Sequence, residues 1–75
     1  MSNYTNAVRI TIDKVKNAKP CCRVYVLESC YDIYSAMNYN YNISYLQEIR
    51  DGLKDFDDVV EYCNIEIGLE TELLT

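Results

Sequence analysis

Hydrophobic and polar residues alternate near the start of the chain. Val8, Ile10 and Ile12 are separated by single polar residues, a period of two that is typical of a half-buried β-strand. A second alternation covers residues 23–27, after a turn-forming segment that ends at Pro20. The pattern therefore predicts a β-hairpin over the first third of the chain.

Spacings of three and four residues replace this alternation in the middle of the chain. They predict a short amphipathic helix from Ser29, its N-cap, to about Asn38. A longer helix of about twenty residues is predicted to follow, with Ser44 as its N-cap. The unbroken periodicity favours one helix over the alternative, a break at Gly52 with Asp55 capping a second helix. The apolar stripe of the long helix consists of Leu46, Ile49, Leu53, Phe56, Val60 and Cys63.

The last segment returns to a period of two. Ile65, Ile67 and Leu69 alternate with Glu66 and Gly68, which predicts a third strand over residues 65–73 with an acidic outer face. The predicted fold class is therefore α+β in the order β-β-α-α-β, a three-stranded, mainly antiparallel sheet with two helices on one face. With 75 residues, the chain is expected to form a single domain, residues 1–75.

Composition restricts the classes of function. Hydrophobic residues make up 49% and charged residues 25% of the chain, which is typical of a folded domain. A chain of this length buries only about 60% of its unfolded surface, which argues against a deep catalytic pocket. The sequence has no His and no Gly-rich phosphate loop. We therefore expect a protein that acts by binding and is not an enzyme.

The four cysteines do not form a recognisable metal motif. Cys21 and Cys22 are adjacent, Cys30 and Cys63 are distant, and no Cys-x-x-Cys pair occurs. Neighbouring residues of a strand point to opposite faces, so Cys21 and Cys22 are not expected to share a metal ion. We therefore expect no zinc site and no cofactor. A metal or redox module that uses the cysteines is a further alternative class of function. No signal peptide and no membrane-spanning apolar run is recognisable, which predicts a cytoplasmic protein with free thiols.

Charge is distributed unevenly along the chain, whose net charge is −5. Residues 1–27 hold five basic residues and one acidic residue, whereas residues 28–75 hold two basic and eleven acidic residues. The acidic part repels nucleic acids and anionic membranes and attracts a basic protein surface. A basic protein surface is therefore the predicted partner, without direct binding of nucleic acid or membrane.

The candidate partner-binding residues are acidic or aromatic. Acidic side chains recur opposite the apolar stripe of the predicted long helix, about every 5 Å along its axis. Two tyrosines fall in the predicted connector between the helices, and tyrosine is common at protein interfaces. The predicted set is Glu48, Asp51, Asp55, Asp57, Asp58, Glu61, Glu66, Glu70, Glu72, Tyr39 and Tyr41.

Two segments near the end of the chain carry a resemblance. Residues 55–62 (DFDDVVEY) and 65–73 (IEIGLETEL) resemble the end of small acidic phage anti-CRISPR proteins that inhibit type II-A Cas9. Those proteins finish with an Ile-rich strand and a Leu-x-Ser-Glu-Leu-like tail, and Leu69–Leu73 is similar to that tail with Glu in place of an expected Lys. The resemblance covers about twenty residues. It implies a DNA mimic that acts in a bacterial host cell, whose carboxylates occupy the basic site where the Cas9–guide RNA complex reads its PAM.

The alternative function belongs to a different class. A basic hairpin and an acidic helix within one chain are suited to associate head to tail. The chain would then be a non-enzymatic structural or assembly protein that forms homo-oligomers. The oligomeric state in solution distinguishes this alternative from an inhibitor of a nucleic-acid-handling protein.

Overall fold

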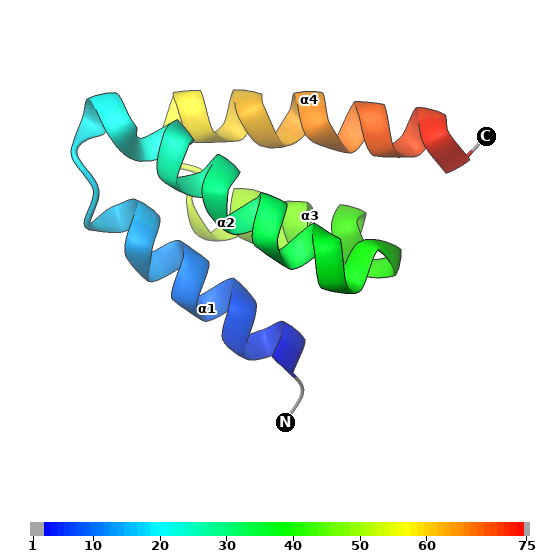
Figure 1. The fold of residues 1–75 in the computed structure, drawn as a ribbon. Coiled ribbons are helices and arrows are strands. Elements are labelled where there is room, and N and C mark those ends of the chain that lie inside the picture. Colours follow the sequence, from blue (N-terminus) through cyan, green and yellow to red (C-terminus); the bar gives the residue numbers. More distant parts are fainter. Residues whose placement is uncertain (1–2, 75) are drawn as a thin grey trace.

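The structure is a computed structural model that describes residues 3–74, and all of its regular elements in this range are helical (Figure 1). The predicted α+β fold is therefore wrong, because residues 3–74 contain no strand. The α-helices are α1 (Asn3–Lys16), α2 (Arg23–Asn38), α3 (Asn42–Gly52) and α4 (Asp57–Leu74), and the 3₁₀ turns are η1 (Pro20–Cys22) and η2 (Tyr39–Tyr41).

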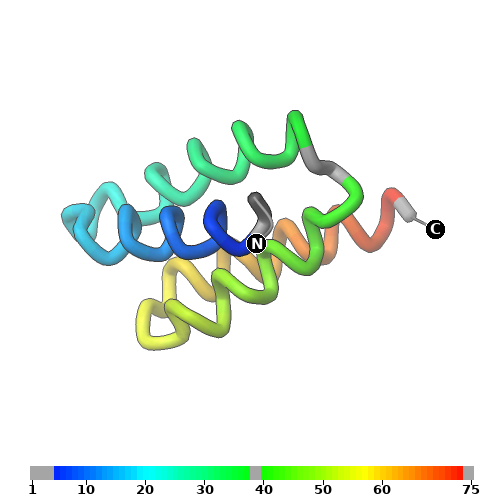
Figure 2. Tube along the Cα trace, turned by 90° about the horizontal axis from the view of Figure 1, so that it is seen from below, coloured from blue at the N-terminus to red at the C-terminus, as the bar shows by residue number. Residues whose placement is uncertain are grey.

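The helices form two antiparallel hairpins, α1–α2 and α3–α4, joined through η2 (Figure 1). Helices α2 and α3 lie in the middle: α1 packs on both of them, and so does α4, whereas α1 and α4 have no contact within the described residues. Figure 2 shows the same arrangement from below, with α1 in front and α4 partly behind α3. The molecule measures 35 × 28 × 18 Å.

The core lies where the four helices meet. Tyr45 is completely buried at its centre, and its ring stacks on that of Tyr34 with 4.1 Å between the ring centroids. The ring of Tyr31 is also stacked with that of Tyr45, with 6.2 Å between the ring centroids. The side chains with essentially no exposed surface are Val15, Leu27, Tyr45, Leu46, Ile49, Leu53, Val59 and Cys63.

The first predicted strand is helix α1. Its buried side chains are Val8, Thr11 and Val15, spaced by three and four residues, whereas Ile10 is 46% exposed. The alternation was misleading because Thr11 counted as polar, yet it is buried and shares a 2.6 Å hydrogen bond with the hydroxyl of Tyr45. A satisfied hydroxyl enters a core at little cost, so a polar residue occupied a core position of a helix.

The second predicted strand is the first part of α2. Leu27, Tyr31 and Tyr34 are its buried positions, again spaced by four and three residues. Ser29, the predicted N-cap, lies inside α2 instead of at its start. The helix begins earlier because Pro20 opens the turn η1, and the carbonyl of Pro20 accepts a hydrogen bond from the N–H of Arg23.

The predicted long helix is broken after Gly52, as in the alternative interpretation. The N–H of Leu53 still donates to carbonyls of the last turn of α3, and the chain then turns before α4 begins. The carbonyl of Phe56 accepts the N–H of Val60 at 3.0 Å, so Phe56, and not Asp55, is the residue that precedes α4. The apolar stripe gave no sign of the break because α3 and α4 both face the same core.

The third predicted strand is the second half of α4. Cys63 is buried and Ile67 is half-buried, whereas Ile65 and Leu69 are 55% and 51% exposed. The inward positions follow the spacing of a helix, and two of them are the half-buried glutamates Glu66 and Glu70. The period of two was therefore coincidental, because isoleucines and leucines also occupy the outer side of α4.

Candidate partner-binding surface

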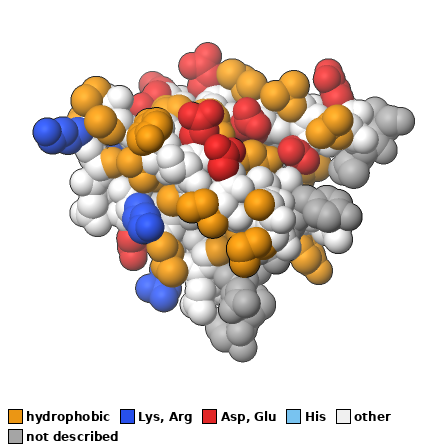
Figure 3. Space-filling model, in the orientation of Figure 1, with side chains coloured by type: hydrophobic (Ala, Val, Ile, Leu, Met, Phe, Trp, Pro, Cys, Tyr) orange, Lys and Arg blue, Asp and Glu red, His pale blue; other side chains and the backbone are white. Residues whose placement is uncertain are grey.

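Four carboxylates from two helices gather on one side of the molecule and form what we call the acidic face: Glu28, Asp32, Glu66 and Glu70. Helix α2 supplies the first two and α4 the last two, each pair one turn apart, and the two helices pack side by side. Acidic side chains are visible along α2 and α4 in Figure 3, whereas the basic ones lie beside α1 and the turn that follows it.

The carboxylates of the acidic face act on one another. Partial burial raises the pKa of Glu66, and the charges of Glu70, Glu28 and Asp32 raise it further. None of the four carboxylates forms an ion pair with a described residue. The acidic face therefore holds negative charge that the fold does not neutralise, and binding of a cation would relieve it.

Two tyrosines belong to the same surface. The hydroxyl of Tyr31 donates a hydrogen bond to Oε2 of Glu70 at 2.9 Å. Burial raises the pKa of Tyr62, and the charges of Glu66, Glu28 and Asp32 add to this effect. Both phenols therefore stay protonated at neutral pH. Tyr31 fixes the position of one carboxylate, and the half-buried ring of Tyr62 lies beside the others.

The predicted acidic residues are not all brought together. Glu66 and Glu70 belong to the acidic face, whereas Glu48 and Asp51 lie on α3 and Asp55 lies in the turn after it. The turn between α3 and α4 divides the predicted row, which assumed one continuous helix. The remaining predicted acids all lie on α4 and are exposed: Asp57, Asp58, Glu61 and Glu72.

Asp58 has a structural role at the start of α4. Its carboxylate accepts the N–H of Val59 at 2.9 Å and lies 3.5 Å from the guanidinium of Arg23. The guanidinium of Arg23 also lies over the ring of Phe56, 4.1 Å from its centroid. This contact joins the start of α2 to the start of α4, so Asp58 is engaged within the fold.

The predicted tyrosine pair in the connector falls in η2. Tyr41 is 59% exposed. The side chain of Tyr39 lies outside the described residues. Three other tyrosines of the same region, Tyr31, Tyr34 and Tyr45, are core residues.

Sequence reasoning missed Glu28, Asp32, Tyr31 and Tyr62. The available signal was spacing, because Glu28 and Asp32 are four residues apart, as are Glu66 and Glu70. On helices, each pair shares a side. Residues 23–27 and 65–73 were assigned to strands, and so the pairs were not recognised as helical rows.

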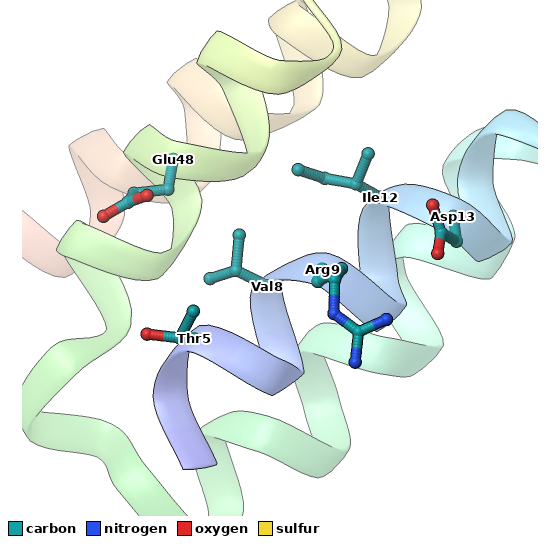
Figure 4. Close-up of a pocket in the computed structure, with 6 residues that line it drawn as sticks. All are labelled: Thr5, Val8, Arg9, Ile12, Asp13 and Glu48. Atoms are coloured by element: carbon teal, nitrogen blue, oxygen red, sulfur yellow. The ribbon is translucent and has the colours of Figure 1, made fainter. Parts of the chain in front are cut away.

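Two cavities flank α1. One, of about 260 Å³, lies between α1 and α3, where Val8 and Ile12 point toward α3 and Glu48 lies at its edge (Figure 4). The guanidinium of Arg9 extends away from α3 in this view. The other, of about 290 Å³, lies between α1 and α2 and is mainly apolar. No carboxylate of the acidic face lines either cavity.

The cysteines are free thiols in this structure, two of them exposed and close together. The Sγ atoms of Cys21 and Cys22 lie 3.7 Å apart in η1, whereas the strand interpretation placed them on opposite faces. Cys30 is half-buried and Cys63 is buried. Within the described residues, no three His, Cys, Asp or Glu side chains are grouped so that they could hold a metal ion.

Comparisons with known proteins give no relative. No protein-family model, no curated protein and no solved structure matches this chain. The resemblance to anti-CRISPR proteins gains no support from them, and the terminal strand that it implied is part of α4. Among residues 3–74, no helix has both the length and the hydrophobicity needed to cross a membrane.

Proposed function

We propose that this protein is a small binding protein whose acidic face engages a basic surface of a nucleic-acid-handling protein and competes with nucleic acid for it. The observation that carries the proposal is the convergence of four carboxylates from α2 and α4 without an ion-pair partner among the described residues. Like charges one helical turn apart destabilise a helix by a few tenths of a kcal/mol, so this arrangement acts against folding. A basic partner turns the same repulsion into binding energy.

The surface offers the interactions that arginine and lysine use. An arginine can form two parallel hydrogen bonds with a carboxylate, and the exposed Glu28 and Asp32 are open to such contacts. The ring of Tyr62 provides an aromatic surface beside them for a guanidinium. Carboxylates about 6 Å apart along each helix form two rows, and a site that binds the phosphates of a nucleic acid can accept them.

The proposal is tested with two charge-reversed variants of equal net charge. The first, Glu28→Lys with Asp32→Lys, alters the acidic face; the second, Asp51→Lys with Asp55→Lys, alters exposed acids outside it. Each tagged protein is incubated with nuclease-treated bacterial lysate over a salt series, and captured proteins are quantified by mass spectrometry. Circular dichroism verifies that both variants retain their helices.

We expect the unaltered protein and the control variant to capture the same nucleic-acid-handling protein. Capture is expected to fall with salt and with added DNA, since both weaken binding to a basic site. The acidic-face variant is expected to lose at least about 90% of this capture, equivalent to at least about 1.4 kcal/mol of binding free energy. Equal capture by both variants would contradict the proposal, because net charge alone would then explain binding.

A further inference from the structure

An apolar groove runs between α1 and α2, and Tyr45 of α3 also lines it. It has a volume of about 290 Å³. Ile10 of α1 and Ile33 and Met37 of α2 line it, and they are 46%, 69% and 78% exposed. Lys14 also lines it, on the α1 side. Small monomeric proteins rarely expose contiguous apolar surface without a use.

A complementary apolar ridge lies on α4. Ile65, Leu69 and Leu73 are 55%, 51% and 80% exposed and follow one another at intervals of four residues. Such a spacing places them along one side of the helix, over about 12 Å. Glu61 and Glu72 are both exposed. They border the ridge on the same edge, because a separation of eleven residues is about three helical turns.

The dimensions of groove and ridge agree. The groove is lined from Ala7 to Lys14 on α1 and from Cys30 to Met37 on α2. Each wall therefore spans about 10 Å, close to the 12 Å of the ridge. A helix laid between two others is an ordinary way to extend a helical bundle, and it places its apolar side chains in the gap between them.

The charges also agree. Among the described residues, Lys14 is the only basic one that lines the groove, and the ridge carries Glu61 and Glu72 along one edge. The ridge docks with this edge toward α1, because Lys14 lies on that wall of the groove. Two ridges facing each other would bring together the glutamates of both copies, and two grooves would leave the space between them unfilled. The complementary pairing is ridge with groove.

We infer that the α1–α2 groove of one copy binds the Ile65–Leu69–Leu73 ridge of a second copy. The contact joins different surfaces of the two copies, so each bound copy keeps one groove or one ridge available. Association through it increases with protein concentration and continues beyond a dimer unless a ring closes. A single helix in a groove is a small interface, and we expect dissociation constants of about 10 µM to 1 mM. The inference does not depend on the proposed function, since it uses different residues.

Complementation between two variants provides a sharp test. Leu69→Glu places a charge on the ridge and leaves the groove intact; Met37→Glu places a charge in the groove and leaves the ridge intact. Both side chains are at least half exposed, so the fold is expected to tolerate the changes. Tyr25→Glu is the matched control, because Tyr25 is 71% exposed on α2 and does not line the groove.

Sedimentation velocity over about 10 µM to 1 mM, a range chosen around the expected affinity, gives the readout. We expect the unaltered protein and the Tyr25→Glu variant to associate with increasing concentration. Leu69→Glu and Met37→Glu, each alone, are expected to weaken association at least about tenfold. Mixed in equal amounts, these two variants are expected to form a 1:1 heterodimer that grows no further, because only one intact groove and one intact ridge meet.

Three results would overturn the inference. A sedimentation coefficient that stays monomeric for the unaltered protein would show that the two surfaces do not bind each other. Association that persists in either single variant would place the contact elsewhere. A mixture of the two variants that stays monomeric would show that groove and ridge are not partners. The Glu28→Lys, Asp32→Lys variant should still self-associate, which separates this inference from the proposed function.

Discussion

At the scale of single residues, the most informative contact is the buried hydrogen bond between Thr11 and Tyr45. It joins α1 to α3 across the core, and both side chains are almost completely inaccessible. Burial raises the pKa of Tyr45 to about 12, although the hydrogen bond with Thr11 acts in the opposite direction. The phenol is therefore neutral in any ordinary buffer, and its hydroxyl needs a partner within the protein.

We expect Thr11→Val to lower the free energy of unfolding by about 1–3 kcal/mol, because it leaves the buried hydroxyl of Tyr45 without its partner. Adding Tyr45→Phe removes that hydroxyl, so the double variant should be no less stable than Thr11→Val alone. Urea unfolding of both single variants and the double variant measures the coupling. Additive losses would contradict a specific interaction between the two hydroxyls.

A second prediction concerns Glu66 and the pH dependence of stability. Its raised pKa means that the folded state holds this proton more tightly than the unfolded state, whose pKa is near 4.5. The penalty for its charge is absent below that value and develops as pH rises through the folded-state pKa. Glu66→Gln should therefore match the unaltered protein near pH 4 and exceed its stability at pH 7 by about 0.5 kcal/mol.

Urea unfolding at several pH values between 4 and 7 checks this expectation. Glu61→Gln is the control, because it removes the same charge from the outer side of α4, where the side chain is exposed. A Glu66→Gln variant that is less stable at pH 7 than the unaltered protein would show that the carboxylate makes a favourable contact.

At the scale of elements, the two glycines occupy helices for different reasons. Neither has a positive φ. A Cβ on Gly52 would lie 2.6 Å from Cδ1 of Ile12, so α3 approaches α1 closely there. A Cβ on Gly68 would have no neighbour within 4 Å. Gly52 therefore leaves room for the end of the Ile12 side chain, whereas Gly68 weakens α4 without a steric reason.

Alanine substitutions distinguish the two sites. We expect Gly68→Ala to raise the free energy of unfolding by about 1 kcal/mol, the difference in helix propensity. Gly52→Ala should gain less, because Ile12 must move, and should recover the full gain in an Ile12→Val background that lacks Cδ1. Thermal or urea unfolding gives these values. Equal gains at both sites in the native background would contradict the close approach of α3 to α1.

The elements were only partly predictable. The existence of a helix around residues 44–52 and its buried positions Leu46 and Ile49 followed from periodicity and are confirmed. The three predicted strands are wrong because five to nine residues with mixed apolar spacing satisfy both periods. In a short helix-only fold, isoleucine and leucine also occupy exposed positions, and this imitates the alternation of a strand.

At the scale of the whole molecule, charge is separated in space as well as along the chain. Four of the seven basic residues lie on α1 and the turn after it, and the acidic face lies on α2 and α4. The helices α1 and α4 do not touch within the described residues, so the two regions do not neutralise each other directly. Repulsion within the acidic face therefore opposes folding.

Salt should stabilise this protein. Raising NaCl from about 10 mM to 1 M shortens the Debye length from about 30 to 3 Å and screens the repulsion. We expect the urea midpoint of the unaltered protein to rise with salt, and that of the Glu28→Lys, Asp32→Lys variant to rise less. The Asp51→Lys, Asp55→Lys variant has the same net charge and should respond like the unaltered protein. An equally reduced response in both variants would assign the effect to overall charge, and equal responses of all three proteins would show that charge repulsion does not cause it.

The sequence by itself determined which residues carry charge, how unevenly that charge is distributed, and which apolar side chains of α3 are buried. These properties depend on residue type and on spacing within one helix, which are local. The tertiary structure decided that α2 packs against α4, and thereby that Glu28 and Asp32 meet Glu66 and Glu70. It also decided that Thr11 is a core residue, because its burial depends on the hydroxyl of Tyr45, 34 residues away. No local pattern specifies which helices pack together, since that follows from filling a shared core.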